Sequence, residues 1–319
     1  MDFKSLLSAL FVLSSMARLN LAAESIDIAS KVGKITEGYV LDLVPSRSLY
    51  TNGLFECAIT CHKRFPCYYF NYQSALERSG ICEVFREYLS TKDIHRLLLP
   101  KPGFVFVQTE LLLRSCLDFR SGSSKSGTYH IFDEKSKLIY EVYCDFTTEP
   151  GMVWTLVSSR RSNQLLSIPF FTNYAIDEEN PNWVNYRLSL GRMEALQKLS
   201  THWRVTCNLP TDGVDYRDYV RAKFSEVDIV HLNGKGLCKQ VEYVNIRGYN
   251  CSLCMTPWWQ ISSHLFHTDS WNFKICGAMS ISGSVNSEDN FGYYGQKNAA
   301  FRCTKDPDST TNWWFGGHA

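Results

Sequence analysis

Short runs in which apolar and polar residues alternate recur along much of the chain. The clearest are 126–132, 140–146 and 151–157, which are rich in β-branched and aromatic residues. Gly, Ser, Lys or Pro separates each run from the next, and these residues favour turns. The pattern therefore predicts a series of short antiparallel strands from Cys116 onward.

The first cluster of cysteines predicts a helix bridged onto a β-hairpin. Thr51 or Asn52 can cap a helix over 54–62. The aromatic-rich segment 67–72 and the segment 81–85 are typical of two strands. Two cysteines of the helix then lie one turn apart on the same face. Geometry favours two nested bridges, although four cysteines allow three pairings; the favoured pairs are Cys57 with Cys82 and Cys61 with Cys67.

A second helix is predicted over 185–199. Leu188, Met193, Leu196 and Leu199 fall on one helical face in this segment. We expect the two basic residues Arg192 and Lys198 to point outward, and the helix to pack on the sheet as part of the scaffold.

Residues 1–23 have the pattern of a secretory signal peptide. A basic residue, Lys4, precedes the apolar run 6–13, and small residues end the segment at Ala22 and Ala23. The apolar run is far shorter than the roughly 20 residues that span a bilayer. No later stretch is long and apolar enough to cross a membrane, so we expect a secreted protein without a membrane span.

Charge excludes some classes of function. The chain has 33 Lys and Arg against 32 Asp and Glu, and removing Lys4, Arg18 and Asp2 with the leader makes the two numbers equal. A neutral chain does not hold a polyanion by bulk charge, which argues against nucleic-acid binding. It also does not gather cations by composition alone.

Twelve cysteines follow the leader, an even number that indicates disulfides in an oxidising compartment. Four fall early and eight are spread over the rest of the chain, which places a domain boundary near 110–116 and predicts domains 24–112 and 113–319. The one acceptor sequon makes Asn250 a candidate glycosylation site. The cysteines are Cys57, Cys61, Cys67, Cys82, Cys116, Cys144, Cys207, Cys238, Cys251, Cys254, Cys276 and Cys303.

The first domain resembles the PAN/apple module. That module combines a cysteine-bearing helix, a short Cys-x-x-Phe strand and a closing strand with a cysteine, and here Phe70 completes the match between Cys67 and Cys82. The resemblance covers residues 30–112. It implies a helix on a curved antiparallel sheet that binds protein or carbohydrate without catalysis.

The second domain opens like a fibrinogen C-terminal domain. Its signals are a cysteine, a Ser-Gly-x-Tyr-x-Ile run, a Val-Tyr-Cys-Asp run and a turn into Trp-Thr, over Cys116 to Val157. A bridge between Cys116 and Cys144 would stabilise this start by roughly 3 to 4 kcal/mol in the chain-entropy model. After residue 157 the family's landmarks fade, so we expect a β-rich but divergent domain.

The resemblance raises the question of calcium, which the fibrinogen family binds through closely spaced aspartates. This chain has no Asp-x-Asp-x-Asp run, and its nearest candidates are 288–290 and 306–308, which we expect to be solvated loops. His264, His267 and Asp269 are a weak metal triplet. We therefore expect no metal site and no cofactor, with calcium unsupported by a ligand motif.

The chain lacks the common sequence motifs of catalytic sites and the full pattern of a redox site. The chain has no Gly-x-Ser-x-Gly elbow, His-Glu-x-x-His helix or phosphate-binding loop, so we expect no enzyme. Cys251 and Cys254 have the spacing of a redox pair or half a zinc site, but they lack the surrounding pattern of either. We expect both to form structural bridges to other cysteines of the second domain, which are Cys207, Cys238, Cys276 and Cys303.

Aromatic residues are dense late in the chain. We expect most of them to fill the core, because large aromatics dominate core burial. Neighbouring tryptophans on a strand point to opposite faces, so one of each pair is expected to face solvent. The candidate ligand-binding residues are therefore Trp258, Trp259, Trp313 and Trp314.

Together these features predict an α+β protein in which a small disulfide-stapled PAN/apple-like domain precedes a larger, β-rich, divergent fibrinogen C-terminal-like domain. The combination is similar to that of secreted proteins of the coral skeletal organic matrix. The resemblance implies non-enzymatic adhesion or recognition in an extracellular matrix, around mineral, with matrix proteins or glycans as partners. The alternative is a soluble, calcium-dependent lectin of innate defence. The ligand, the oligomeric state and the pairing of the last six cysteines stay open.

Overall fold

The computed structural model describes residues 34–64, 67–74, 79–87, 89, 91–109, 113–119, 125–133, 135–136, 138–163, 168–286 and 288–319. The chain divides into two compact units, Met1–Leu112 and Leu113–Ala319. This is the position at which the cysteine spacing divides the sequence. The predicted signal peptide, residues 1–23, lies outside the described residues.

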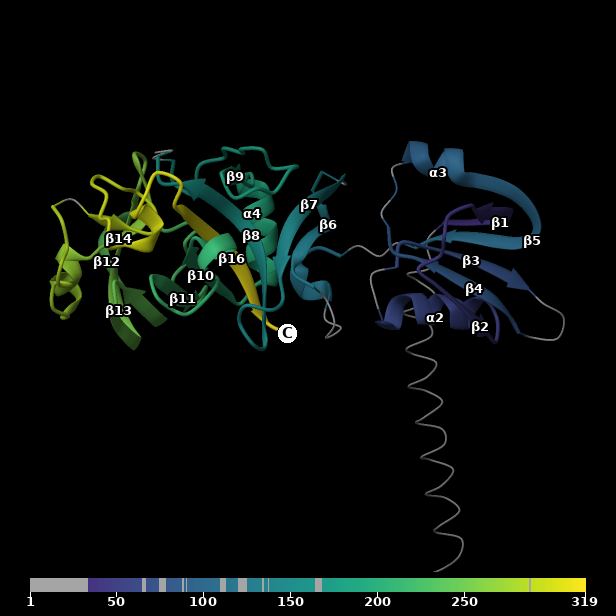
Figure 1. Ribbon diagram of the computed structural model, residues 1–319, viewed down its shortest axis with the longest axis horizontal. Coiled ribbons are helices and arrows are strands. Elements are labelled where there is room, and N and C mark those ends of the chain that lie inside the picture. Colours follow the sequence, from purple (N-terminus) through teal and green to yellow (C-terminus); the bar gives the residue numbers. More distant parts are fainter. Residues whose placement is uncertain are drawn as a thin grey trace, which may run out of the picture. The chain divides into compact units, whose positions relative to one another are not determined.

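The first unit is built on a five-stranded antiparallel sheet (Figure 1). The order of strands across the sheet is β1-β5-β3-β4-β2, and α2 packs against β3 and β4. The elements are β1 (Lys34–Leu41), β2 (Arg47–Thr51), α2 (Leu54–Arg64), β3 (Tyr69–Ser74), β4 (Gly80–Phe85), α3 (Thr91–Leu97) and β5 (Leu98–Gln108).

Side chains cover both faces of this sheet. Phe70 and Val107 pack with the cysteines of α2 in one apolar cluster, whereas Tyr69 and Phe106 belong to a second cluster that includes Ile94 of α3. Neighbouring residues of a strand point to opposite faces, which explains the division. The bridges Cys57–Cys82 and Cys61–Cys67 connect α2 to the hairpin, and they are the two nested pairs predicted from the sequence.

The second unit is a β-rich fold with few helices. Its large sheet has the order β15-β14-β13-β12-β11-β10-β16-β8-β7-β6, and β9 pairs with β8 (Figure 1). The last strand, β16, therefore lies inside the sheet. The elements are η1 (Cys116–Phe119), β6 (Gly127–Asp133), β7 (Leu138–Asp145), β8 (Met152–Arg161), β9 (Asn185–Arg187), α4 (Leu190–Leu199), β10 (His202–Cys207), α5 (Leu209–Asp212), β11 (Tyr219–Lys223), β12 (Gly234–Ile246), β13 (Tyr249–Ile261), β14 (His264–Asp269), η2 (Trp271–Cys276), β15 (Asp289–Asn290), η3 (Arg302–Thr304) and β16 (Thr310–His318).

The helix predicted over 185–199 is shorter than expected. Residues 185–187 form β9 instead, and α4 begins at Leu190. Arg192 was expected to point outward, and this was wrong, because its side chain is 6% exposed and bonds to Glu179 at 2.6 Å. Its guanidinium also lies 3.9 Å from the centre of the Tyr140 ring. Acidic and aromatic neighbours distant in sequence therefore make burial of this cation favourable.

A second buried arginine organises the middle of the sheet. Arg204 is fully buried between the rings of Trp154 and Trp314, each centred 4.8 Å from its guanidinium. It forms ion pairs with Asp145 and with Glu149, the latter at 3.2 Å. Such a pair is costly to break from one side, because the remaining charge stays buried.

Four disulfides stabilise the second unit, and the described residues contain no free cysteine. Cys251 and Cys254 bridge to each other, so the expectation that each would bridge to a more distant cysteine was wrong. Leu253 between them has a φ of 51°, a left-handed turn that lets two cysteines on one strand meet. The pairs are Cys116–Cys144, Cys207–Cys303, Cys238–Cys276 and Cys251–Cys254.

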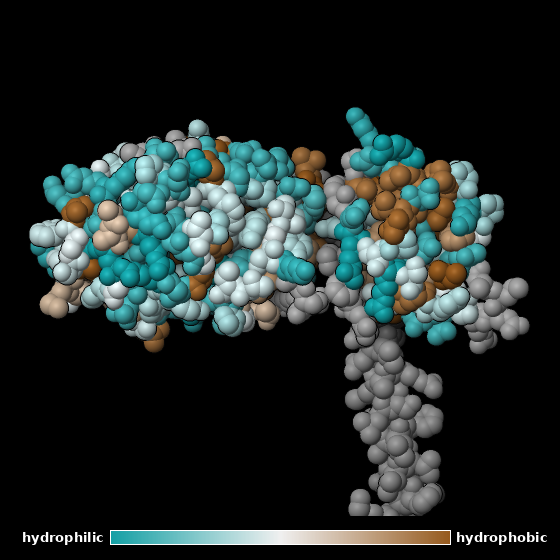
Figure 2. All heavy atoms as spheres, viewed as in Figure 1, coloured by the Kyte–Doolittle hydropathy of each residue, from teal (hydrophilic) through white to brown (hydrophobic). Residues whose placement is uncertain are grey.

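The surfaces of the two units differ in character. Figure 2 shows several apolar residues together on the visible face of the first unit, whereas the visible face of the second unit is mostly polar. Exposed apolar side chains of the first unit include Val44 (88%) and Tyr50 (76%). Within the described part of the chain, none of the helices combines the length and apolar character needed to cross a bilayer.

Candidate functional site

Of the four tryptophans expected to bind ligand, Trp259 alone is accessible. Trp258, Trp313 and Trp314 are 0%, 2% and 0% exposed, so none of these three is available to a ligand. The expectation of one accessible ring in each pair was right for Trp258 and Trp259 and wrong for Trp313 and Trp314. Trp258 and Trp259 alternate across β13, which turns Trp258 into the core and leaves Trp259 half-buried at the surface. Trp313 and Trp314 are both buried because β16 lies between β10 and β8 and side chains cover both of its faces.

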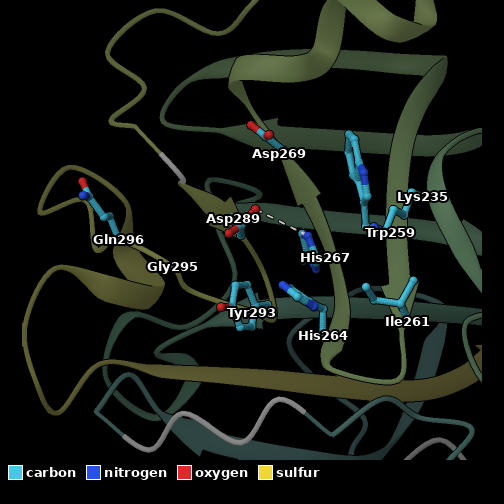
Figure 3. A pocket seen from close by; sticks show the side chains of 10 residues that line it. All are labelled: Lys235, Trp259, Ile261, His264, His267, Asp269, Asp289, Tyr293, Gly295 and Gln296. Atoms are coloured by element: carbon cyan, nitrogen blue, oxygen red, sulfur yellow. Dashed lines mark ion pairs between the residues drawn. The ribbon is translucent and has the colours of Figure 1, made fainter.

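A cavity of about 530 Å³ opens beside Trp259. Its walls come from β12, β13, β14, β15 and the segment after β15, which are brought together because these strands are neighbours in the sheet (Figure 3). Aromatic rings stand beside carboxyl, amide and ammonium groups in this cavity. The lining residues are Lys235, Trp259, Ile261, His264, His267, Asp269, Asp289, Tyr293, Gly295 and Gln296.

His267 lies at the buried end of this cavity, with a side chain that is 5% exposed. Its Nδ1 lies 2.6 Å from the carbonyl oxygen of Leu265. A carbonyl oxygen accepts hydrogen bonds and cannot donate them, so Nδ1 carries the proton and Nε2 is left as an acceptor. Burial lowers the pKa of His267 to about 4, so the ring is neutral at pH 7.

Asp289 faces this acceptor nitrogen. The distance from its Oδ1 to Nε2 of His267 is 3.4 Å (Figure 3). Burial, and then the charge of Asp269, raise the pKa of Asp289 to about 7. Two atoms that both carry lone pairs repel each other unless a proton lies between them. The carboxyl of Asp289 is therefore partly protonated near neutral pH.

The neighbouring residue Glu288 fixes β15 in place. Glu288 is buried and pairs with Arg247, and it accepts hydrogen bonds from Asn298 Nδ2 at 2.9 Å and from the backbone nitrogen of Val285 at 3.0 Å. Its negative charge is thus compensated inside the protein. Since Asp289 follows directly, this network sets the position of its carboxyl group.

Aromatic rings form the sides of the cavity. Trp259 lies nearly parallel to His267, with ring centres 6.0 Å apart and planes 11° apart. The rings of His264 and Tyr293 are centred 4.2 Å apart. Sequence reasoning missed Tyr293 as a site residue, although it belongs to the late aromatic-rich region.

The acidic segments 288–290 and 306–308 were expected to be solvated loops, and this was wrong for 288–290, because Glu288 and Asn290 are buried. Glu288 bonds to Arg247, and Asp289 lines the cavity. Asp308 lies on the surface near Arg161, at 3.5 Å. Among the described residues, no group of three or more His, Cys, Asp or Glu side chains is arranged to hold a metal ion.

Asn250 is exposed at the start of β13. Its amide nitrogen donates to the carbonyl oxygen of Gly248 at 3.3 Å, and the Cys251–Cys254 bridge follows directly. The side chain is therefore on the surface, as a glycosylation site requires.

Six disulfides in a β-rich chain define an extracellular protein, since such bridges persist in oxidising compartments. The family model of the C-terminal globular domain of fibrinogen beta and gamma chains matches residues 112–202, a longer stretch than the 116–157 expected. That family consists of extracellular recognition domains. No curated protein matches the chain. The cavity is formed by later residues than the matched stretch.

Proposed function

We propose that the chain is a secreted, non-enzymatic recognition protein of the extracellular matrix, and that its second unit binds carbohydrate in the cavity beside Trp259. The observation that carries this proposal is the cavity's combination of flat rings with polar side chains. Aromatic rings pack against the C–H faces of a sugar, and carboxyl, amide and ammonium groups bond to its hydroxyls. Most of these side chains stand on strands, which hold them rigidly, whereas Tyr293 and Gln296 come from the segment after β15.

The first unit contributes protein contacts in this proposal. We assign it to the PAN/apple type on its helix, hairpin and nested bridges, and its exposed Val44 and Tyr50 are suited to apolar contact with matrix proteins. The organic matrix of a coral-type mineralised skeleton is the setting that the module combination favours. An N-glycan at Asn250 belongs to the same proposal, and a glycosidase that removes such glycans should then reduce the mass.

The proposal includes no catalysis. Among the described residues, the cavity lining has no Ser, Thr or Cys, so it lacks an aliphatic hydroxyl or a thiol as nucleophile. We expect no turnover of ester, peptide or glycoside panels by the purified protein. Hydrolysis that disappears in an Asp289→Asn variant would contradict this part of the proposal.

Two substitutions at adjacent positions test the binding site. Trp259→Ala should abolish saturable glycan binding with little loss of stability, because this ring is half-buried at the cavity. Trp258→Ala is the matched control, which should cost about 3 to 5 kcal/mol of stability through the core. Binding is measured on an array of glycans and matrix proteins with the oxidised full chain.

The same array, run with and without a chelator, tests the alternative of a calcium-dependent lectin. We expect binding to be unchanged by the chelator, since the proposal includes no cofactor. Loss of binding to acetylated sugars on chelation would favour the lectin of innate defence. Binding that survives in Trp259→Ala would place the glycan site elsewhere.

A further inference from the structure

Two carboxyl groups line the cavity from facing strands. Asp269 of β14 and Asp289 of β15 are directly opposite each other in the antiparallel pair. Opposite residues of such a pair have Cβ atoms about 5 Å apart on the same face, and like charges there repel. Among the described residues, Asp289 contacts the neutral ring of His267 and pairs with no cationic side chain, and Asp269 forms no ion pair.

The surrounding groups leave this repulsion uncompensated. His267 is neutral because its burial disfavours the charged ring. The nearby cation Arg247 is paired with Glu288, and among the described residues no ion pair joins Lys235 to either carboxyl group. The backbone nitrogen of Gly295 donates a hydrogen bond to Asp289. The charged and titratable side chains around Asp289 are Lys235 of β12, His264, His267 and Asp269 of β14, Glu288 directly before β15, and Tyr293 after it.

The orientation of Asp269 is already fixed. Its Oδ1 accepts hydrogen bonds from the backbone nitrogens of Trp271 at 2.8 Å and Asn272 at 3.3 Å. These bonds fix the direction in which the carboxyl group points. A cation placed between Asp269 and Asp289 would therefore meet one fixed negative charge and a second carboxyl that can release its proton.

We propose that the cavity binds an amino sugar that carries a free ammonium group, with Asp269 and Asp289 holding the ammonium and Trp259 packing against the sugar ring. This inference rests on the proposed function, and it specifies the class of glycan. The rings of Trp259, His264 and Tyr293 favour a flat, rigid sugar over a flexible aliphatic amine, and their faces also attract cations. N-acetylation would remove the charge that the two carboxyl groups are placed to meet.

Binding exchanges the ammonium for a proton. Below pH 7 the carboxyl of Asp289 is mostly protonated, since its pKa is about 7. When the ammonium binds, the O–H bond of Asp289 breaks, the proton leaves to solvent, and the carboxylate that remains pairs with the cation. Affinity for the amino sugar should thus rise by about tenfold per pH unit below pH 7, and it should fall again once the pH exceeds the pKa of the sugar's own amine.

The test compares two probes that differ only in acetylation, the trimer of glucosamine and the trimer of N-acetylglucosamine. Titration calorimetry of the oxidised full chain at pH 7 should give about tenfold tighter binding of the free amine. Runs in two buffers of different ionisation enthalpy should detect proton release with this probe alone. Asp289→Asn should remove both the preference and the proton release, whereas the surface control Asp308→Asn, 77% exposed, should keep both.

The outcomes separate this inference from the proposed function. Equal, Trp259-dependent binding of both trimers would refute the amine preference and leave carbohydrate binding intact. Binding of neither trimer, nor of any arrayed glycan, would refute both. If a lysine-containing peptide binds as tightly as the glucosamine trimer, the ligand's ammonium group belongs to a protein. That result would refute the amino sugar as the ligand. If Asp289→Asn does not fold, two other measurements test the same inference. Asp269→Asn should lose the preference for the free amine, and the affinity of the wild-type chain should rise with pH below pH 7.

Discussion

Replacement of Asp289 by Asn should change how stability depends on pH. The pKa of Asp289 is raised from 3.8 to about 7, so the folded state holds a proton that the unfolded state releases. The wild-type carboxyl therefore contributes a loss of stability as pH rises from 4 to 7. Asparagine does not titrate, so the free energy of unfolding of Asp289→Asn minus that of the wild type should increase over this range.

The size of the effect follows from the shift. One pKa unit corresponds to about 1.4 kcal/mol, so a shift from 3.8 to about 7 sets an upper limit of about 4 kcal/mol. The side chain is 14% exposed and opens into the cavity, which reduces the expected change to roughly 3 kcal/mol. His267→Gln should give the opposite sign. Its pKa is lowered from 6.5 to about 4, so the wild-type ring adds stability as pH rises through this window.

Urea unfolding followed by tryptophan fluorescence measures these differences. All eight tryptophans lie in the second unit, so the signal reports that unit alone. Curves at pH 4, 5, 6 and 7, with disulfides intact, give the free energy of unfolding for each variant, with Asp308→Asn as the surface control. A difference between Asp289→Asn and wild type that stays flat or falls over this range would refute the assignment of a protonated carboxyl at the cavity.

Two further predictions concern stability. Arg204→Met should cost about 3 to 5 kcal/mol, because it leaves the buried Asp145 without its cation and removes one of the two arginine partners of Glu149; the same fluorescence assay measures it. A cost below about 1 kcal/mol would contradict the central role of Arg204. Removing the Cys238–Cys276 bridge, with a sequence separation of 38, should cost about 4 kcal/mol, against about 2 kcal/mol for Cys251–Cys254, with a separation of 3. Equal costs for the two double Ser variants would show that loop length does not govern these bridges.

The local pattern of the sequence was sufficient for the bridged helix and hairpin of the first unit. The helical spacing of Cys57 and Cys61 and the two strand-like segments after them lead to the nested bridges seen in the structure. Contacts here join residues close in sequence, so local geometry restricts the choices. Local geometry could not predict the edge of the sheet, since the pairing of β1 with β5 joins segments that are distant in the sequence.

The second unit shows where local reasoning failed. Alternation placed Trp258 and Trp259 on opposite faces of a strand, and that logic held. The same logic failed for Trp313 and Trp314, because whether a strand is covered on one face or on two depends on its place in the sheet. The prediction that Arg192 points outward was wrong for a related reason, since its acidic partners come from other segments of the chain.

The sequence by itself determined the elements that depend on near neighbours: the alternating strands, the cysteine-bearing helix, the even number of cysteines and the division into two units. Tertiary structure alone decided the cavity, because its lining runs from Lys235 to Gln296 and is assembled by the pairing of four strands. It also decided the chemistry of Asp289. Its carboxyl group acquires a pKa near 7 from burial and from the charge of Asp269 on the opposite strand. Neither cause can be inferred from the residues next to Asp289 in the sequence.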